Sequence, residues 1–123
     1  MFDKELVRSI LMQIDTAITT VQKRCDGIED ASFFINSPQG MEKLDGVCML
    51  FIAIGESIKS IDKITAGQLL IKYSKIDWTG VKGFRDIIAH HYFDIDAEQV
   101  FWIISHELKP LSETIKRMIR DIG

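Results

Sequence analysis

The chain has 123 residues, of which 46% are hydrophobic and 27% are charged, so residues 1–123 can form one domain around a buried core. This composition excludes a disordered tail, and the formal net charge of −3 excludes the general basic surface of a protein that coats duplex nucleic acid. Between positions 72 and 92, however, four basic residues stand against two acidic ones, which allows a local anion-binding site.

The sequence predicts a soluble, cytoplasmic protein. Its first segment, MFDKELVRSILMQID, carries charges at helical intervals and lacks the apolar stretch and cleavage site of a signal peptide. The longest uncharged run, GVCMLFIAIG, is about half as long as a membrane-spanning helix. Cys25 and Cys48 have no metal-binding spacing and are expected to be buried, reduced thiols.

Two long helices are predicted in the first half of the chain. The first starts at Asp3, whose side chain can cap it, and ends before Gly27, where a left-handed residue is favoured. The second starts at Ser37 and Pro38, a cap followed by proline at the first helical position, and continues towards Lys63. It is apolar on more than one side, so it is either the central helix of a bundle or contacts another subunit through its second face.

The second half predicts a third helix capped by Asp77 and a fourth capped by Asp96. In the fourth, Gln99 at the third position would complete a capping box. Pro110 lacks a backbone donor, so this helix is expected to bend or restart there. No strand alternation is evident, and the fold is predicted to be an all-α bundle of four to five helices.

Polar residues are concentrated in the segment GVKGFRDIIAHHYFDID, residues 80–96. On a regular helix, Asp86 and His90 are four residues apart and share a face, so they can form a hydrogen bond. Arg85 and Tyr92 also share a face, whereas Arg85 and His90 lie roughly 140° apart around the helix axis. Arg85 and His90 can therefore meet at one ligand only if the helix ends or kinks, or if two subunits share the site.

The side chains of this segment suit phosphate chemistry. Arg85 can bind two phosphate oxygens at once, and His90 can exchange protons near neutral pH. Asp86 would orient His90, and the ring of Tyr92 can stack on a base. His91 points towards the apolar side and is interpreted as a packing or helix-end residue, with substrate binding as the alternative. An ordinary charged helix end is the competing interpretation of the whole cluster.

Glu56 is a further candidate for the site. It lies among apolar residues in the segment AIGES and needs a cationic partner, for which Arg85 and Lys82 are the candidates. Such a pair would place Glu56 and Lys82 at a substrate-binding cleft. The competing interpretation is an ordinary acidic residue on a helix surface.

A metal site is not expected. The neighbouring His90 and His91 diverge by about 100° on a helix, and no third ligand has a useful spacing. His106 is expected to be solvated. Trp78 and Trp102 are interpreted as core or interface aromatics rather than as platforms for bases.

The segment GFRDIIAHHYFDID resembles the signature of the HEPN superfamily, an arginine followed four to six residues later by a histidine. It is most similar to the HepT-like branch, whose form Arg-x4-His-x-Tyr is matched by Arg85, His90 and Tyr92. The segments AIGESIKSI, YSKIDWTGVKGFRD and VFWIISHELKPL are also similar to that branch, so the resemblance covers most of the chain from about Phe51 onward. The branch commonly has asparagine where this chain has Asp86.

This resemblance implies a homodimeric helical bundle and a metal-independent RNase without a cofactor. Such proteins are usually toxins of toxin–antitoxin modules, whose partner, the minimal nucleotidyltransferase MntA, transfers AMP onto the motif tyrosine, here Tyr92. Arg85, His90 and Asp86 would be the catalytic residues, in a cleft at the dimer interface that admits RNA. The carboxylate of Asp86 would either weaken RNA binding or raise the basicity of His90.

Two other functions are consistent with the same residues. The chain could be a non-catalytic partner of a nucleotidyltransferase, binding a nucleotide or substrate through Arg85 and His90. It could also be a bundle with a structural, dimer-forming role. Cleavage of RNA without added metal, compared with His90→Ala, separates the RNase from the non-catalytic partner, and a gene for a small nucleotidyltransferase beside this one would disfavour the structural role.

Overall fold

The computed structural model describes residues 2–89 and 96–123, and all regular structure in these two ranges is helical. The elements are α1 (Lys4–Arg24), α2 (Ser32–Ile35), α3 (Pro38–Ile64), a 3₁₀ turn (Leu70–Lys72), α4 (Trp78–Lys82), α5 (Phe84–Ala89), α6 (Ala97–His106) and α7 (Leu108–Ile122). The predicted all-α fold is confirmed. None of the helices in the described ranges combines the length and apolarity needed to cross a bilayer.

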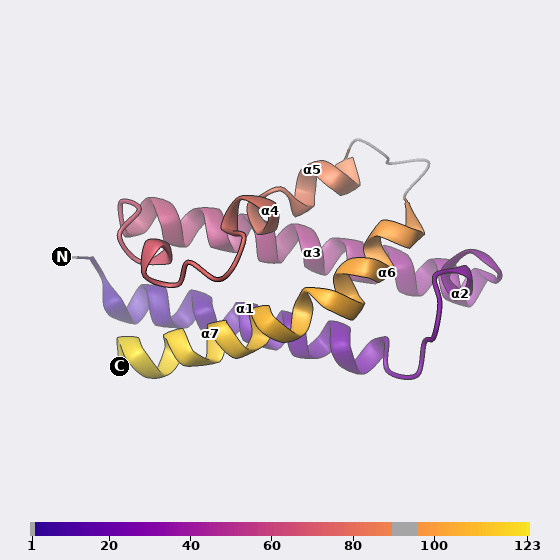
Figure 1. The fold of residues 1–123 in the computed structure, drawn as a ribbon, viewed down its shortest axis with the longest axis horizontal. Coiled ribbons are helices and arrows are strands. Elements are labelled where there is room, and N and C mark those ends of the chain that lie inside the picture. The colour runs from indigo at the N-terminus through magenta and orange to yellow at the C-terminus, as the bar shows by residue number, and fades with distance from the viewer. Residues whose placement is uncertain (1, 90–95) are drawn as a thin grey trace.

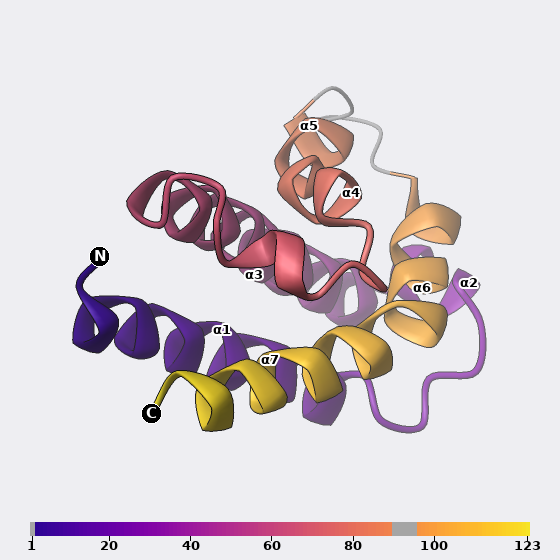
Figure 2. The ribbon, with the colours of Figure 1, turned by 60° about the vertical axis from the view of Figure 1, so that its left-hand side comes forward.

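Three helices form the long axis of the molecule (Figure 1 and Figure 2). α1 and α3 run antiparallel side by side, and α7 returns along α1, so the two termini lie at the same end of the bundle. The buried stripe of α1 recurs every three or four residues and consists of Val7, Leu11, Ile14, Ile18 and Val21. Burying each such side chain contributes about 1.5–3 kcal/mol, so this stripe is a main source of stability.

The capping residues predicted from the sequence are in place at four helix starts. The side chains of Asp3, Ser37, Asp77 and Asp96 accept hydrogen bonds of 3.0–3.1 Å from the N–H groups three residues later. Each bond satisfies a donor that has no partner within its helix, which typically contributes about 1 kcal/mol. Gly27, beyond the end of α1, has the predicted left-handed conformation, with φ +84°.

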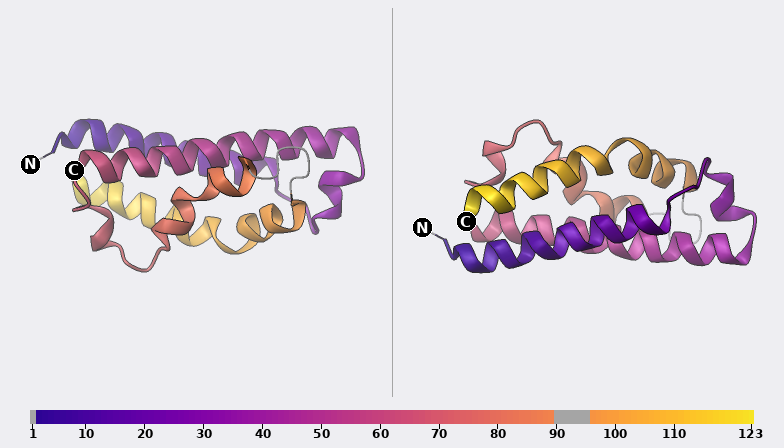
Figure 3. Two further views of the ribbon diagram at one scale, coloured as in Figure 1. Left: turned by 90° about the horizontal axis from the view of Figure 1, so that it is seen from above. Right: turned by 90° about the horizontal axis from the view of Figure 1, so that it is seen from below.

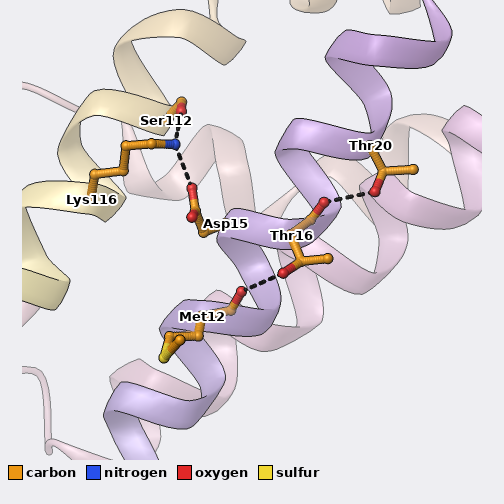
Figure 4. Close-up of polar contacts among 6 residues, drawn as sticks. All are labelled: Met12, Asp15, Thr16, Thr20, Ser112 and Lys116. Atoms are coloured by element: carbon orange, nitrogen blue, oxygen red, sulfur yellow. Dashed lines mark hydrogen bonds and ion pairs between the residues drawn. The ribbon is translucent and has the colours of Figure 1, made fainter.

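An ion pair joins the first and last helices (Figure 4). Nζ of Lys116 on α7 donates to Oδ1 of Asp15 on α1 at 2.7 Å and to Oγ of Ser112 at 3.2 Å. On α1, the hydroxyl groups of Thr16 and Thr20 donate to carbonyl oxygens one turn earlier, so these groups are satisfied within the helix. The pair is thus a polar contact between α1 and α7 at the surface, beside the apolar packing of the two helices.

α3 is the central helix, because α1, α2, α4 and α5 all pack against it (Figure 3). This confirms the prediction that this helix is apolar on more than one side because it is the central helix of the bundle. One face of α3 is nevertheless open in the described chain, where Met41 and Met49 are 53% and 67% exposed. Contact of this face with another subunit stays a prediction.

The helix boundaries differ from the prediction in three places. α2 was not predicted, because four residues are too few to show a periodic pattern. The predicted third helix is divided at Gly83, a residue of low helix propensity, into α4 and α5. The break expected at Pro110 falls at Glu107, so Pro110 lies in the first turn of α7, where its missing N–H needs no helical partner.

Cys25 and Cys48 are free and buried, as predicted. Burial raises the pKa of both thiols, that of Cys48 to about 11. The thiols are therefore protonated at neutral pH and act as small apolar groups in the core rather than as nucleophiles.

Gly55 allows α4 and α5 to approach the central helix closely. A Cβ atom at this position would lie 2.9 Å from the carbonyl oxygen of Val81 and 3.6 Å from Cβ of Phe84. The ring of Phe84 also packs against Phe51, one turn before Gly55, with 5.1 Å between the ring centroids. A contact between α3 and the backbone of α4 therefore sets the position of the segment that carries Arg85.

We expect Gly55→Ala to destabilise the protein by about 1–2 kcal/mol, because the overpacking against Val81 outweighs the better helix propensity of alanine. Urea unfolding measures this free energy. Gly46→Ala is the matched control on the same helix, since its Cβ would meet only the flexible side chain of Arg24, at 3.5 Å. Gly46→Ala should be neutral or stabilising, and equal effects of the two changes would contradict the close contact at Gly55.

Candidate active site

The guanidinium group of Arg85 is held at the surface where α5 meets α3. The preceding residue, Phe84, is only 2% exposed and anchors α5 on the core, whereas the Arg85 side chain is 56% exposed. Nη1 of Arg85 donates to Oε1 of Glu56, on α3, at 2.8 Å. A guanidinium has five N–H donors, so this bond orients the group and leaves donors available to a ligand.

A second ion pair lies beside the first along the contact between α3 and the α4–α5 segment. Nζ of Lys82 is 2.6 Å from Oδ2 of Asp62, and Glu56 is also 3.4 Å from Nζ of Lys59. The structure thus pairs Glu56 with Arg85, and Lys82 with a different acid. The side chains of the two inter-helix pairs are between 30% and 56% exposed, so solvent screens them and they orient the cations more than they stabilise the fold.

The carboxyl group of Glu56 is charged at neutral pH. The hydrogen bond from Arg85 is the main cause that lowers its pKa; desolvation opposes this effect, and the nearby Lys59 adds to it. Because the pKa is lowered in the folded protein, the favourable contribution of the pair is present at neutral pH and is lost as acid protonates the carboxylate. Arg85 therefore has a charged anchor at neutral pH.

The described residues include four of the seven predicted site residues, namely Glu56, Lys82, Arg85 and Asp86. Asp86 is exposed on α5, next to Arg85. His90, His91 and Tyr92 lie outside the described residues, so the hydrogen bond between Asp86 and His90 and the meeting of Arg85 with His90 stay predictions. The roles of Glu56, Lys82 and His91 in substrate binding also stay predictions.

Two aromatic residues have surroundings that the sequence did not indicate. Trp102 is not a core residue, since it is 51% exposed and stacks on the ring of His106, with 4.7 Å between centroids. His106 is exposed, as predicted. Trp78 is half-buried, and its Nε1 donates to the carbonyl oxygen of Tyr73 at 2.9 Å. An interface role for either tryptophan stays a prediction.

No three His, Cys, Asp or Glu side chains converge as metal ligands within residues 2–89 and 96–123. The pair His90 and His91 lies between these ranges. The expectation that the motif binds no metal therefore stays a prediction.

The fold and the surface around Arg85 define a small all-helical protein with an anchored cation beside a histidine-containing motif. The chain belongs to the HepT-like family, described as "Ribonuclease HepT-like", whose profile matches residues 14–118. The matched range includes the whole motif from Arg85 to Tyr92. The family predicted from the sequence is therefore confirmed.

Relatives whose names describe them as RNases support the same family assignment. The chain is 30% identical over 69 residues to "Putative RNase MJ0127" of Methanocaldococcus jannaschii, covering 56% of this chain and 54% of that protein. It is 28% identical over 67 residues to "Putative RNase TTE0752" of Caldanaerobacter subterraneus subsp. tengcongensis, covering 54% of this chain and 56% of that protein. The chain thus spans about half the length of these relatives. No solved structure shows a significant match.

Proposed function

We propose that this protein is an RNase that cleaves RNA without a metal ion, using Arg85 to bind the scissile phosphate and His90 to transfer protons. The observation that carries the proposal is the guanidinium of Arg85, fixed by Glu56 at 2.8 Å and yet 56% exposed. An oriented arginine with free donors is the group best suited to bind phosphate oxygens in pairs. Membership of a family described as ribonucleases supports the same activity.

In the proposed reaction, RNA supplies its own nucleophile, the 2′-hydroxyl group. His90 accepts the proton of this group while its oxygen attacks the adjacent phosphorus. The bond from phosphorus to the 5′-oxygen then breaks, and the leaving oxygen takes a proton from the His90 of a second copy of the chain. Arg85 stabilises the charge that develops on the phosphate oxygens, and Asp86 orients His90.

A homodimer is part of this proposal, and the open face of α3 supports it. Met41, Met49 and Ile52 lie on one side of α3, and Glu56 continues the same side one turn later. Exposed methionines adapt well to a partner surface. A second copy packed on this face about a two-fold axis would bring its own pair of Arg85 and Glu56 close to the first.

The test of the function is incubation of the purified protein with single-stranded RNA in excess EDTA. We expect cleavage products that carry a cyclic phosphate, since the 2′-oxygen becomes bonded to phosphorus. RNA in which the 2′-hydroxyl groups are methylated is the matched control and should stay intact. Binding of RNA without cleavage would favour the non-catalytic partner instead, and neither binding nor cleavage would reject the proposal.

The proposed regulation is transfer of AMP to Tyr92 by a minimal nucleotidyltransferase, as in a toxin–antitoxin module. Tyr92 is seven residues after Arg85, and in this proposal an attached AMP would add bulk and negative charge to the RNA-binding site. Arg85 keeps guanidinium donors that its bond to Glu56 does not use, and these are the donors for which an added phosphate and the RNA backbone would compete in this proposal.

We expect Tyr92→Phe to abolish AMP labelling when the protein is co-expressed with such a nucleotidyltransferase, because the acceptor oxygen is lost. Intact mass measurement and peptide mapping check this result. Tyr73→Phe is the matched control, since Tyr73 is 8% exposed and its hydroxyl is engaged by Asp121, so this change should leave the labelling intact. Undiminished labelling of Tyr92→Phe would show that another residue accepts AMP.

A further inference from the structure

The two chain ends lie at the same end of the bundle (Figure 1), and residues from that end line a groove of about 610 Å³. Three separate parts of the chain form it: the start of α1, the segment around the 3₁₀ turn, and the end of α7. The charged and polar residues of its lining include Lys4, Lys72, Tyr73, Arg117 and Asp121. This groove lies outside the surface around Arg85 and plays no part in the reaction proposed above.

The groove has an excess of positive charge on a mildly acidic protein. Lys4, Lys72 and Arg117 line it and are all exposed. Within the part of the chain that the structure describes, none of these three cations has a carboxylate oxygen within 4.0 Å, although four other cations do. Asp121 is the one acid among the described lining residues, so the charges do not cancel.

Tyr73 gives this groove a fixed floor. It is 8% exposed, and its hydroxyl donates to Oδ2 of Asp121 at 2.8 Å. The guanidinium carbon of Arg117 lies 5.0 Å from the centre of the Tyr73 ring. Arg117 is thus oriented by a cation–π contact rather than by an ion pair, so its charge and its hydrogen-bond donors stay available to an anion.

We propose that this groove binds the phosphate backbone of the RNA strand outside the cleavage site. The inference rests on the proposed function, because it gives the substrate a second contact with the enzyme. Glu56, the anchor of Arg85, is eight residues before Ile64 at the end of α3, which corresponds to roughly 12 Å along the helix. In this proposal the RNA strand runs from Arg85 past the end of α3 to the groove, which Leu69, Lys72 and Tyr73, a few residues after α3, help to line.

The chemistry of the groove favours a polymer of phosphates over other ligands. Its cations come from three separate segments and line an open surface, so they suit successive phosphates rather than one enclosed anion. An acidic protein segment would offer carboxylates, which the lysines also bind. It is the alternative ligand if RNA binding does not depend on the groove.

The test compares RNA binding by two triple variants of the full chain, each with two lysines and one arginine neutralised. The groove variant carries Lys4→Ala, Lys72→Ala and Arg117→Gln. The control variant carries Lys23→Ala, Lys109→Ala and Arg24→Gln, three exposed cations outside the groove. Fluorescence anisotropy with a labelled RNA, carrying 2′-O-methyl groups so that it is not cleaved, gives the affinity at several salt concentrations.

We expect the groove variant to bind this RNA between about 10-fold and 100-fold more weakly near 0.1 M salt, with a salt slope smaller by about 2, since each phosphate contact on a single strand contributes about 0.7. The control variant should bind like the wild type. Circular dichroism checks that both variants are folded, and Lys72→Ala alone, which changes only an exposed side chain, gives a second measurement if the triple variant unfolds.

The outcomes separate the groove from the cleavage site. If the groove variant binds as tightly as the control while the wild type cleaves RNA, the groove proposal is wrong and the proposed function stands. If the wild type neither binds nor cleaves RNA, both proposals fail. Equal losses in both variants would show non-specific attraction and would also overturn the groove, leaving an acidic protein segment as the ligand to test.

Discussion

Replacement of Arg85 by alanine is expected to slow RNA cleavage by about 10²–10³-fold, the usual effect of removing one group that stabilises charge in a transition state. The melting temperature should change little, because the side chain is 56% exposed and solvent screens its ion pair with Glu56. Single-turnover cleavage of a labelled RNA in EDTA and thermal unfolding, measured on the same preparation, give the two quantities.

A second variant tests whether the shape of the guanidinium matters, and a third is a control for the loss of a nearby cation. Arg85→Lys keeps the charge but loses the planar pair of donors, so it should recover only a small part of the rate. Lys59→Ala removes a cation that contacts the same Glu56 from the other side, at 3.4 Å, and should cleave RNA within about threefold of the wild type. A folded Arg85→Ala protein with wild-type cleavage would remove Arg85 from the mechanism.

Glu56 acts on the reaction only through Arg85 in this proposal, so it is a positioning residue. Glu56→Gln keeps an oxygen that can accept the hydrogen bond from Nη1 but removes the charge that now lies 2.8 Å away. We expect a smaller loss of rate than in Arg85→Ala. Adding Glu56→Gln to Arg85→Ala should lower the rate almost no further, since Glu56 acts only through the side chain that Arg85→Ala has already removed.

The starts of the helices could be predicted because capping is a local interaction. Asp3, Ser37 and Asp96 each bond to an N–H group three residues later, and such pairs are visible in the sequence. The break at Gly83 was not predicted, because a glycine within a helical apolar pattern does not by itself end the helix. The packing of this segment against α3 could not be predicted either, because the contact of Gly55 with Val81 joins residues far apart in the chain.

The ion-pair partner of Glu56 in the candidate site likewise could not be predicted from the sequence alone. The sequence indicated that Glu56 needs a cation but offered both Arg85 and Lys82, which are only three residues apart. The crossing of α4 and α5 over α3 decides between them, and this is a property of the tertiary structure. In contrast, the assignment of His90 and Tyr92 to the site rests on the motif and the family match alone.

His90→Ala is expected to cause the largest loss of activity among these variants. Removing a group that transfers a proton usually lowers a rate by about 10²–10⁴-fold. In a homodimer of the variant, both imidazoles are absent, so the base that activates the 2′-hydroxyl and the acid that protonates the 5′-oxygen are lost together. The loss should therefore lie at the upper end of that range, with RNA binding largely retained.

The adjacent histidine provides a matched control for this experiment. His91→Ala removes the same side chain one position later, and helical geometry would direct it about 100° away from His90. Cleavage by His91→Ala should stay within about tenfold of the wild type, in keeping with a packing or peripheral substrate-binding role. Full activity in folded His90→Ala would reject the mechanism. Equal, severe losses in both variants, together with lower melting temperatures, would assign the two histidines a structural role. Another residue would then have to transfer the protons.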